Sequence, residues 1–349
     1  MKVAVVNSMA PFVWGGAEEL ASHLIRNLRD QGLEAHDYRI PFAWEPYTGL
    51  PFEIARSKLL RFDDYDRVIS LKFPVYCLEA EHHTTWLIHQ FRQAYDLWNS
   101  PYCGIPHDAA GIRVRNIIHD EDRRVFTSRE RLFTISEEIS RRLRDATGVV
   151  ARPLRAPLND PQLFQGGPDE GYILAPGRVN AAKRQSLLVR AAAKLPANCR
   201  LIVAGPPESD EDARALHELV ERHSLEDKVE LDLRFLSREE LARYVNHSRA
   251  VAYIPFQEDS YGYVTMEAFE AGKPVVTSND AGELLEIVKH GHTGQVAEPT
   301  PEALAAAMDR YISNGRLAAS HGMAAREGWR SLGINWGNTI EALLGTRSC

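Results

Sequence analysis

The sequence contains no apolar run of the roughly 18 residues that a helix needs to cross a bilayer. Its Met-Lys start leads directly into a short apolar segment, without the longer apolar core of a secretory signal. We therefore expect a cytoplasmic protein whose own chain does not anchor it in a membrane.

Cysteine is scarce and widely spaced. The four cysteines, Cys77, Cys103, Cys199 and Cys349, form no CxxC pair, which indicates neither a zinc knuckle nor a disulfide framework and fits a reducing compartment. Cys77 and the histidines at 82, 83 and 89 lack the spacing of a closed tetrahedral zinc site. We expect no bound metal and no cofactor.

An excess of positive charge is also missing, because the formal net charge is −7. Binding to nucleic acid needs a cationic surface that displaces counterions from phosphates, so we expect no nucleic-acid partner. One basic cluster is interpreted as a solvated helix face, with peripheral contact to the inner face of a membrane as the alternative. The cluster consists of Arg141, Arg142, Arg144, Arg152 and Arg155.

Two familiar nucleotide-binding signatures are absent. No GxGxxG follows the first apolar run of either half, which disfavours a dinucleotide-dependent dehydrogenase. A metal-binding DxD would have to follow a strand, whereas Asp64-Tyr65-Asp66 precedes one and Asp120-Glu121-Asp122 lies in a helical stretch. We expect both groups to be solvated acids.

What the chain does contain is an alternation of short apolar runs with helix-like segments, which is typical of buried parallel strands. At 349 residues it fits two domains. Pro and Gly residues between 157 and 168 read as a linker. We predict an α/β protein with two doubly wound domains, at 1–160 and 170–330, and a closing helix at 331–349. The runs are 3–6, 68–71, 85–88, 132–135, 172–174, 201–203, 251–254 and 275–277.

The segment 258–267 carries the densest chemistry. It follows the run 251–254 and opens a helix, so Gly262 permits close backbone approach, and the amides of Tyr263 and Val264 at the first turn are placed to bind a diphosphate. Asp259 precedes this helix and Glu267 lies inside it. The two carboxylates are therefore expected at opposite ends of a ligand, one on sugar hydroxyls and the other on ribose hydroxyls.

Asp259, seven intervening residues, Glu267 and the following Ala268–Val276 together resemble the signature of family 4 glycosyltransferases. The resemblance implies the GT-B fold, in which two Rossmann-like domains face each other across a cleft. That family usually has Glu at the first position, so Asp259 is one methylene shorter, and the neighbouring Glu258 is an alternative sugar contact.

The resemblance continues in Gly177–Lys183, which is similar to the family's diphosphate-binding segment and implies Arg178 and Lys183 as its cations. Fixed cations stabilise the charge that develops on a departing diphosphate. Phe235 and Leu236, after the strand predicted at 229–233, stand where such enzymes hold the nucleotide base.

In the first half, Gly15-Gly16-Ala17-Glu18 is similar to the family's N-terminal glycine loop, which approaches the donor phosphate and the acceptor. Trp86–Gln90 resembles the segment that carries the active-site histidine, which makes His89 the candidate contact to the transferred sugar. A capping or core role is the alternative for His89.

The function implied is transfer of a sugar, with retention of anomeric configuration, from a nucleoside diphosphate sugar to a hydroxyl acceptor in polysaccharide or glycoconjugate synthesis. No carboxylate is evident as a covalent nucleophile, which favours attack from the same face as the leaving group. The alternatives are an epimerase or a phosphorylase on the same fold, or a catalytically silent nucleotide- or sugar-binding module.

Overall fold

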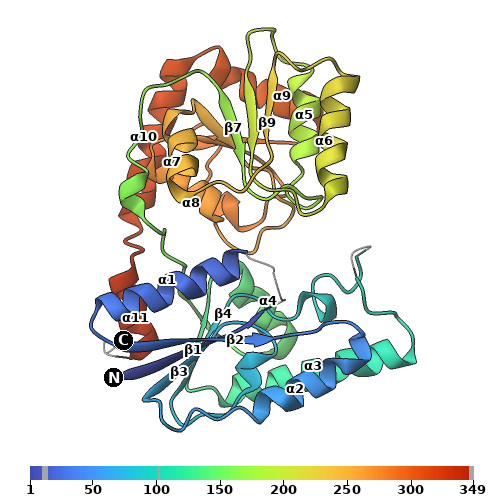
Figure 1. The fold of residues 1–349 in the computed structure, drawn as a ribbon, viewed down its shortest axis with the longest axis vertical. Helices are drawn as coiled ribbons and strands as arrows, with labels where there is room; N and C mark the ends of the chain where they lie inside the picture. Colours follow the sequence, from blue (N-terminus) through green and yellow to red (C-terminus); the bar gives the residue numbers. More distant parts are fainter. Residues whose placement is uncertain (10–14, 101–102, 346–349) are drawn as a thin grey trace. The chain divides into compact units, whose positions relative to one another are not determined.

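The computed structural model describes residues 1–9, 15–100 and 103–345. The chain divides into two compact units (Figure 1). Unit 1 comprises residues 1–157 and the C-terminal segment from Ile334, and unit 2 comprises residues 158–333. Cys349 and the end of the predicted closing segment lie outside the described residues.

A six-stranded sheet forms the centre of unit 1, in the order β2-β1-β3-β4-β5-β6, and all neighbouring strands are parallel. From β1 the chain moves outward to β2 and then returns to place β3 on the other side of β1. Such a reversal is where ligands bind in open α/β sheets, beyond the carboxyl ends of the strands. The strands are β1 Lys2–Met9, β2 Glu34–Pro41, β3 Arg67–Ser70, β4 His83–Leu87, β5 Arg131–Thr134 and β6 Arg152–Pro153.

Helices cover both faces of this sheet. Leu20, Leu24 and Leu28, one turn apart on α1, are fully or almost fully buried, so α1 is amphipathic and packs one apolar face inward. Figure 1 shows α1 beside α11 on one face of the sheet and α2 and α3 on the other. The helices are α1 Gly16–Asp30, α2 Leu50–Lys58, α3 Ala109–Ser128, α4 Glu137–Thr147 and α11 Trp336–Leu344.

The last helix, α11, completes unit 1 although it follows unit 2 in sequence. The indole of Trp336 meets that of Trp86 edge-on, with ring centroids 6.3 Å apart. The Thr84 hydroxyl donates to the carbonyl of Leu343 over 2.9 Å. Two residues of β4 thus anchor α11, so the segment predicted as a separate closing helix belongs to the core of the first half.

Unit 2 has a second parallel sheet, in the order β12-β11-β10-β7-β8-β9. The chain proceeds from β7 outward to β9 and then returns to the other side of β7 with β10, so the reversal lies between β7 and β10. The strands are β7 Ile173–Pro176, β8 Leu201–Ala204, β9 Val229–Asp232, β10 Ala250–Ala252, β11 Val275–Ser278 and β12 Gly294–Ala297.

The helices of unit 2 also lie on two sides of their sheet. Figure 1 shows α5, α6 and α9 on one side and α7, α8 and α10 on the other. Their N-termini are fixed locally: Ser209, Ser237 and Thr300 each accept a backbone N–H of the first turn of α6, α7 and α9. The helices are α5 Gln185–Ala192, α6 Asp210–Arg222, α7 Arg238–His247, α8 Tyr263–Glu270, α9 Pro301–Ile312 and α10 Gly315–Ser331.

The strands that apolar runs did not predict are edge or short strands. β2 and β12 each lie at an edge of their sheet, and β2 contains Glu34, Asp37 and Arg39. A strand covered on one side only needs no continuous apolar run, so the criterion that finds the central strands misses these.

Candidate functional site

Two loops that follow the strands β7 and β10 meet at the point where the order of the second sheet reverses. The backbone N–H of Phe256 donates to the carbonyl of Ala182 over 2.9 Å. Gly177 has φ +111°, and a Cβ on it would lie 3.7 Å from the side chain of Val264, so its main chain is close to the start of α8. The sequence segments 177–183 and 258–267 are therefore neighbours.

Lys183 is at the centre of this junction. Its ammonium forms an ion pair with Glu258 and donates to the hydroxyl of Tyr253 over 2.8 Å. Burial alone would lower the pKa of Lys183, but the neighbouring Tyr253 and Glu258 outweigh it and raise the pKa above its usual value. The ammonium is thus a permanent cation, although the Lys183 side chain is only 25% exposed.

The partner of Lys183 is Glu258, the acid that the sequence placed second to Asp259. The position of Glu258 is fixed by its backbone, whose N–H donates to Ala281 over 3.1 Å and whose carbonyl would lie 2.5 Å from a Cβ on Gly282. Asp259 is half-buried in the same loop. Tyr253, which sequence reasoning missed, is a buried tyrosine at the end of a strand and carried no motif signal.

Gly262 ends this loop and begins α8. It has φ +69°, and a Cβ there would lie 2.8 Å from the ring of Tyr253, so both backbone conformation and space require glycine. Tyr263 and Val264 follow as the half-buried first residues of the helix. The helix start therefore lies against the tyrosine that contacts Lys183.

Glu267 lies on α8 with only 2% of its surface exposed. Its carboxylate forms an ion pair with Arg238 at the start of α7, and Arg238 also donates to the carbonyl of Asn159 over 2.9 Å. The guanidinium lies 4.7 Å from the ring centre of Phe164. No local sequence pattern indicates Arg238, because 29 positions separate it from its partner.

A second arginine braces the loops at the reversal point. The guanidinium of Arg184 donates to both carboxylate oxygens of Asp280 over 2.7 and 2.8 Å, and to the carbonyls of Ile254 and Pro255. These bonds lower the pKa of Asp280. Arg184 itself has a left-handed backbone, φ +56°, so the turn after Lys183 is held by its own side chain. Sequence reasoning missed Arg184, and its position next to Lys183 was the only sequence feature that could have indicated it.

The remaining predicted residues of unit 2 lie at the same carboxyl end of the sheet. Arg178 directly follows Gly177, is half-buried, and accepts a bond from the Gln185 amide at its carbonyl over 2.9 Å. Phe235 is 75% exposed, and Leu236 next to it is half-buried before the first turn of α7. An exposed aromatic ring at a strand end is available for stacking on a base.

In unit 1, Gly15 caps α1 with an extended backbone, and its N–H donates to the carboxylate of Glu18 over 3.0 Å. A Cβ on Gly16 would meet nothing within 4 Å, so no packing within the described residues requires glycine there. Glu18 is buried and forms an ion pair of 2.8 Å with Lys72, which follows β3. This pair joins the loops at the strand reversal of the first sheet.

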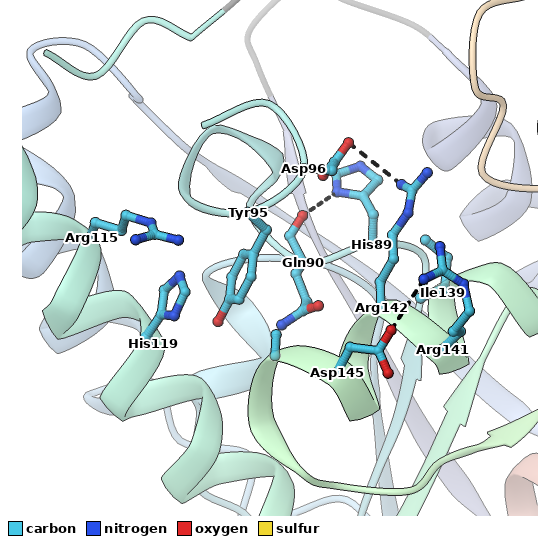
Figure 2. A pocket seen from close by; sticks show the side chains of 11 residues that line it. His89, Gln90, Tyr95, Asp96, Arg115, His119, Ile139, Arg141, Arg142 and Asp145 are labelled. Carbon is cyan, nitrogen blue, oxygen red and sulfur yellow. Dashed lines mark hydrogen bonds and ion pairs between the residues drawn. The ribbon is translucent and has the colours of Figure 1, made fainter. Parts of the chain in front are cut away.

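His89 follows β4 at the carboxyl edge of the first sheet and lines a pocket of about 330 Å³ (Figure 2). Its Nδ1 donates to the carbonyl of Gln90 over 2.7 Å, because a carbonyl can only accept. That contact makes Nδ1 the protonated nitrogen of the neutral ring. His89 is half-buried and opens onto a cavity, which differs from the environment of a core histidine.

The expectation that both acidic triplets are solvated is wrong for Asp122. This residue is fully buried on α3, and its carboxylate accepts from the hydroxyls of Tyr76 and Tyr95, each over 2.8 Å. Asp120, two positions earlier, has a side chain 76% exposed. The helix turns one acid of the triplet into the core and another into solvent.

Three residues of the basic cluster, Arg141, Arg142 and Arg144, lie on α4, where acids of the same helix pair with them. Arg141 and Arg142 both contact Glu138, over 2.6 and 2.7 Å, and Arg141 also contacts Asp145 over 3.1 Å. Burial would raise the pKa of Glu138, but its hydrogen bonds to the two arginines lower it on balance. This pairing is what a solvated helix face shows.

No three His, Cys, Asp or Glu side chains among the described residues are grouped so that they could hold a metal ion. None of the helices formed by the same residues is both long and apolar enough to cross a membrane.

Comparison with known proteins gives a family match for the second half of the chain. Residues 162–328 match the family model of glycosyl transferases group 1. This range contains all the predicted diphosphate, ribose and base contacts of unit 2.

A curated relative from Kineococcus radiotolerans, a D-inositol 3-phosphate glycosyltransferase, is 32% identical over 193 residues. The match covers 50% of this chain and 43% of that protein, so the chain spans less than half the length of this relative.

Two solved structures match over the whole chain. HepE of Anabaena, solved in complex with UDP and glucose, has a TM-score of 0.73 at 17% identity and covers 98% of both chains. Sucrose-phosphate synthase of Thermosynechococcus elongatus has a TM-score of 0.75 at 17% identity, with 99% of this chain and 98% of that chain covered. These likenesses confirm the predicted α/β fold of the GT-B class.

Proposed function

We propose that the whole chain is a retaining glycosyltransferase, because its residues 162–328 match the family model of glycosyl transferases group 1. It transfers a sugar from a nucleoside diphosphate sugar to a hydroxyl acceptor. The observation that carries the proposal is the junction of Lys183, Glu258 and the first turn of α8 at the strand reversal of unit 2.

Lys183 supports the proposal through its unused donor. An ammonium has three N–H groups, and two of them point to Glu258 and Tyr253. No other partner of this ammonium is found in the part of the chain that the structure describes, so the third N–H can bind a phosphate oxygen. Held in this way, the cation stabilises the diphosphate more strongly as it leaves, because its negative charge then grows.

The first turn of α8 supplies a second contact of the same sign. Backbone N–H groups at a helix start bind anions, and Gly262 lets a phosphate approach the main chain without meeting a side chain. Arg178, in the loop beside this turn, is the third proposed diphosphate contact. We propose that the departing diphosphate then takes the proton of the acceptor hydroxyl, which attacks from the same face.

The other predicted contacts divide along the donor. Glu267 binds the ribose hydroxyls, Asp259 with Glu258 binds the sugar, and Phe235 with Leu236 holds the base. UDP is the first nucleotide to test, because the structural neighbour HepE was solved with UDP. We place the acceptor and the His89 contact on unit 1, and we expect a cytoplasmic enzyme that uses no cofactor.

The test is release of nucleoside diphosphate from UDP-sugars by the purified chain, with and without EDTA. We expect nucleoside diphosphate to be released in both conditions, because Lys183 and Arg178 supply the positive charge that a metal ion would otherwise provide. A silent binding module would bind UDP and release nothing, and an epimerase would interconvert sugars without releasing UDP. Loss of UDP affinity by a hundredfold in EDTA would contradict the metal-independent site.

A further inference from the structure

The pocket beside His89 has a chemistry that the donor does not explain. It lies wholly in unit 1, between the end of β4 and the helices α3 and α4. Figure 2 shows Arg115 and His119 on one side of it and Arg141, Arg142 and Asp145 on the other. Three arginines line the pocket against two aspartates, Asp96 and Asp145. With neutral histidines, the lining carries an excess positive charge.

The three arginines are not equivalent. Arg142 contacts Glu138 over 2.7 Å and Asp96 over 3.5 Å, and Arg141 contacts Glu138 and Asp145. Their charges are already shared with carboxylates of the chain.

Arg115 differs, because it contacts neutral groups: its Nε donates to the carbonyl of Ala94 over 2.9 Å, and its guanidinium lies 4.8 Å from the ring centre of Trp98. Within residues 1–9, 15–100 and 103–345, no carboxylate pairs with it. A stacked guanidinium with unused N–H groups is a pre-organised contact for an oxyanion.

The side chains around Arg115 are held by contacts within unit 1. The rings of Tyr95 and His119 stack 4.2 Å apart, and the Nε2 of His119 donates to the same Ala94 carbonyl over 2.9 Å. Burial lowers the pKa of His119, so its ring is neutral at neutral pH and does not compete with Arg115 for an anion. The Tyr95 hydroxyl is held by the buried Asp122 over 2.8 Å. The side of the pocket formed by Arg115, Tyr95 and His119 is therefore preformed in the absence of a ligand.

We propose that this pocket binds the anionic group of the acceptor, a sugar that carries a phosphate monoester or a carboxylate, with Arg115 as the principal contact. Only the identification of the bound sugar as the acceptor rests on the proposed function; anion binding by the pocket does not. His89 lines the same pocket, so an anion held by Arg115 places the rest of the sugar beside the histidine proposed to act in transfer.

Calorimetry on the full chain tests the pocket with three probes: glucose 6-phosphate, glucuronate and glucose. We expect at least one charged probe to bind about tenfold or more tightly than glucose, the effect of one charge-assisted hydrogen bond. The phosphate and carboxylate arms separate the two acceptor classes. Equal affinities for all three probes would overturn the proposal.

Two variants that change the affinity for the charged probe in opposite directions test whether the probe binds at Arg115. Arg115→Gln should remove the preference for the charged probe, whereas Arg113→Gln, on the exposed side of the same helix, should keep it. Asp96→Asn should tighten binding of the charged probe, because it removes a pocket anion and with it the carboxylate that pairs with Arg92 over 2.7 Å and with Arg142 over 3.5 Å. A misfolded protein cannot produce that gain. Unchanged preference in Arg115→Gln, or weaker binding in Asp96→Asn, overturns the assignment.

UDP binding by the same preparations keeps this test separate from that of the proposed function. Arg115→Gln should bind UDP as the unmodified chain does, because Arg115 is not among the proposed nucleotide contacts. If the unmodified chain binds charged sugars but not UDP, the proposed function fails and the anion pocket stands.

Discussion

The carboxylate of Glu267 and the guanidinium of Arg238 form an ion pair between α8 and α7, inside unit 2. The carboxylate is almost fully buried, and the Arg238 side chain is 23% exposed. Because Glu267 is the proposed ribose contact, the pair orients a carboxylate that would otherwise be a costly buried charge. We therefore propose Arg238 as a positioning residue that orients the proposed ribose contact Glu267.

Arg238→Gln should destabilise unit 2 and weaken donor binding together. Removing one partner of a buried pair leaves an uncompensated charge, which costs about 3 to 5 kcal/mol in the free energy of unfolding, toward the low end here because Arg238 is partly exposed. Arg238→Gln combined with Glu267→Gln should restore stability but not donor affinity. Urea unfolding and UDP calorimetry on the single and double variants separate the two effects. A double variant that regained full UDP affinity would contradict the role of Glu267.

Lys183→Met should lower turnover with UDP-sugar by much more than any loss of folded protein can explain. The ammonium is proposed to stabilise charge on the departing diphosphate, and loss of one such contact reduces kcat by about a hundredfold. Lys194→Met is the matched control, because Lys194 forms an exposed pair with Glu302 at 2.8 Å. Steady-state kinetics and melting temperature of both variants are the measurement. Equal kinetics of the two variants would remove Lys183 from the diphosphate site.

His89→Ala should reduce transfer by roughly 30- to 150-fold, the effect of a hydrogen bond of about 2 to 3 kcal/mol that strengthens in the transition state. His89→Asn separates this role from a structural one, because its amide can still donate to the Gln90 carbonyl. We expect His89→Asn to melt as the unmodified chain does and to transfer as poorly as His89→Ala. A destabilised His89→Ala with full turnover per folded molecule would assign His89 to the core.

The sequence predicted those parts of the fold that local patterns encode. Val3–Val6 and Val275–Thr277 are continuous apolar runs, so the central strands were found, and the loops after them followed from sheet topology. Arg238 was missed because 29 positions separate it from Glu267, and Tyr253 was missed because its contact with Lys183 spans 70 positions. The placement of α11 in unit 1 depends on contacts with Trp86 and Thr84, which no local pattern records.

Asp122 is a different kind of failure, because a signal existed. The buried residues Val114, Ile118, Asp122 and Val125 recur at helical spacing on α3, so periodicity places Asp122 on the core face. The charged neighbours Asp120 and Glu121 obscured this in a reading based on composition. Helical phase is the better guide for a single acid inside a charged stretch.

Burial raises the pKa of Asp122 to about 7, although hydrogen bonds from Tyr95 and Tyr76 act in the opposite direction. An unfolded aspartate has a pKa of about 3.9. Between these values the unfolded chain loses the proton while the folded chain keeps it, so the free energy of unfolding falls as pH rises, by about 1.4 kcal/mol per pH unit and roughly 4 kcal/mol in all.

Asp122→Asn removes this dependence, since an amide can still accept from one tyrosine and donate to the other. Five of the six tryptophans belong to the sequence of unit 1, so fluorescence during urea unfolding at pH 5 to 8 reports mainly on this unit. The variant should gain stability over the unmodified chain from pH 5 to about 7 and keep a constant difference above that. Asp120→Asn, on the exposed side of α3, should show no such trend, and an Asp122→Asn difference independent of pH would mean that Asp122 does not titrate in this range.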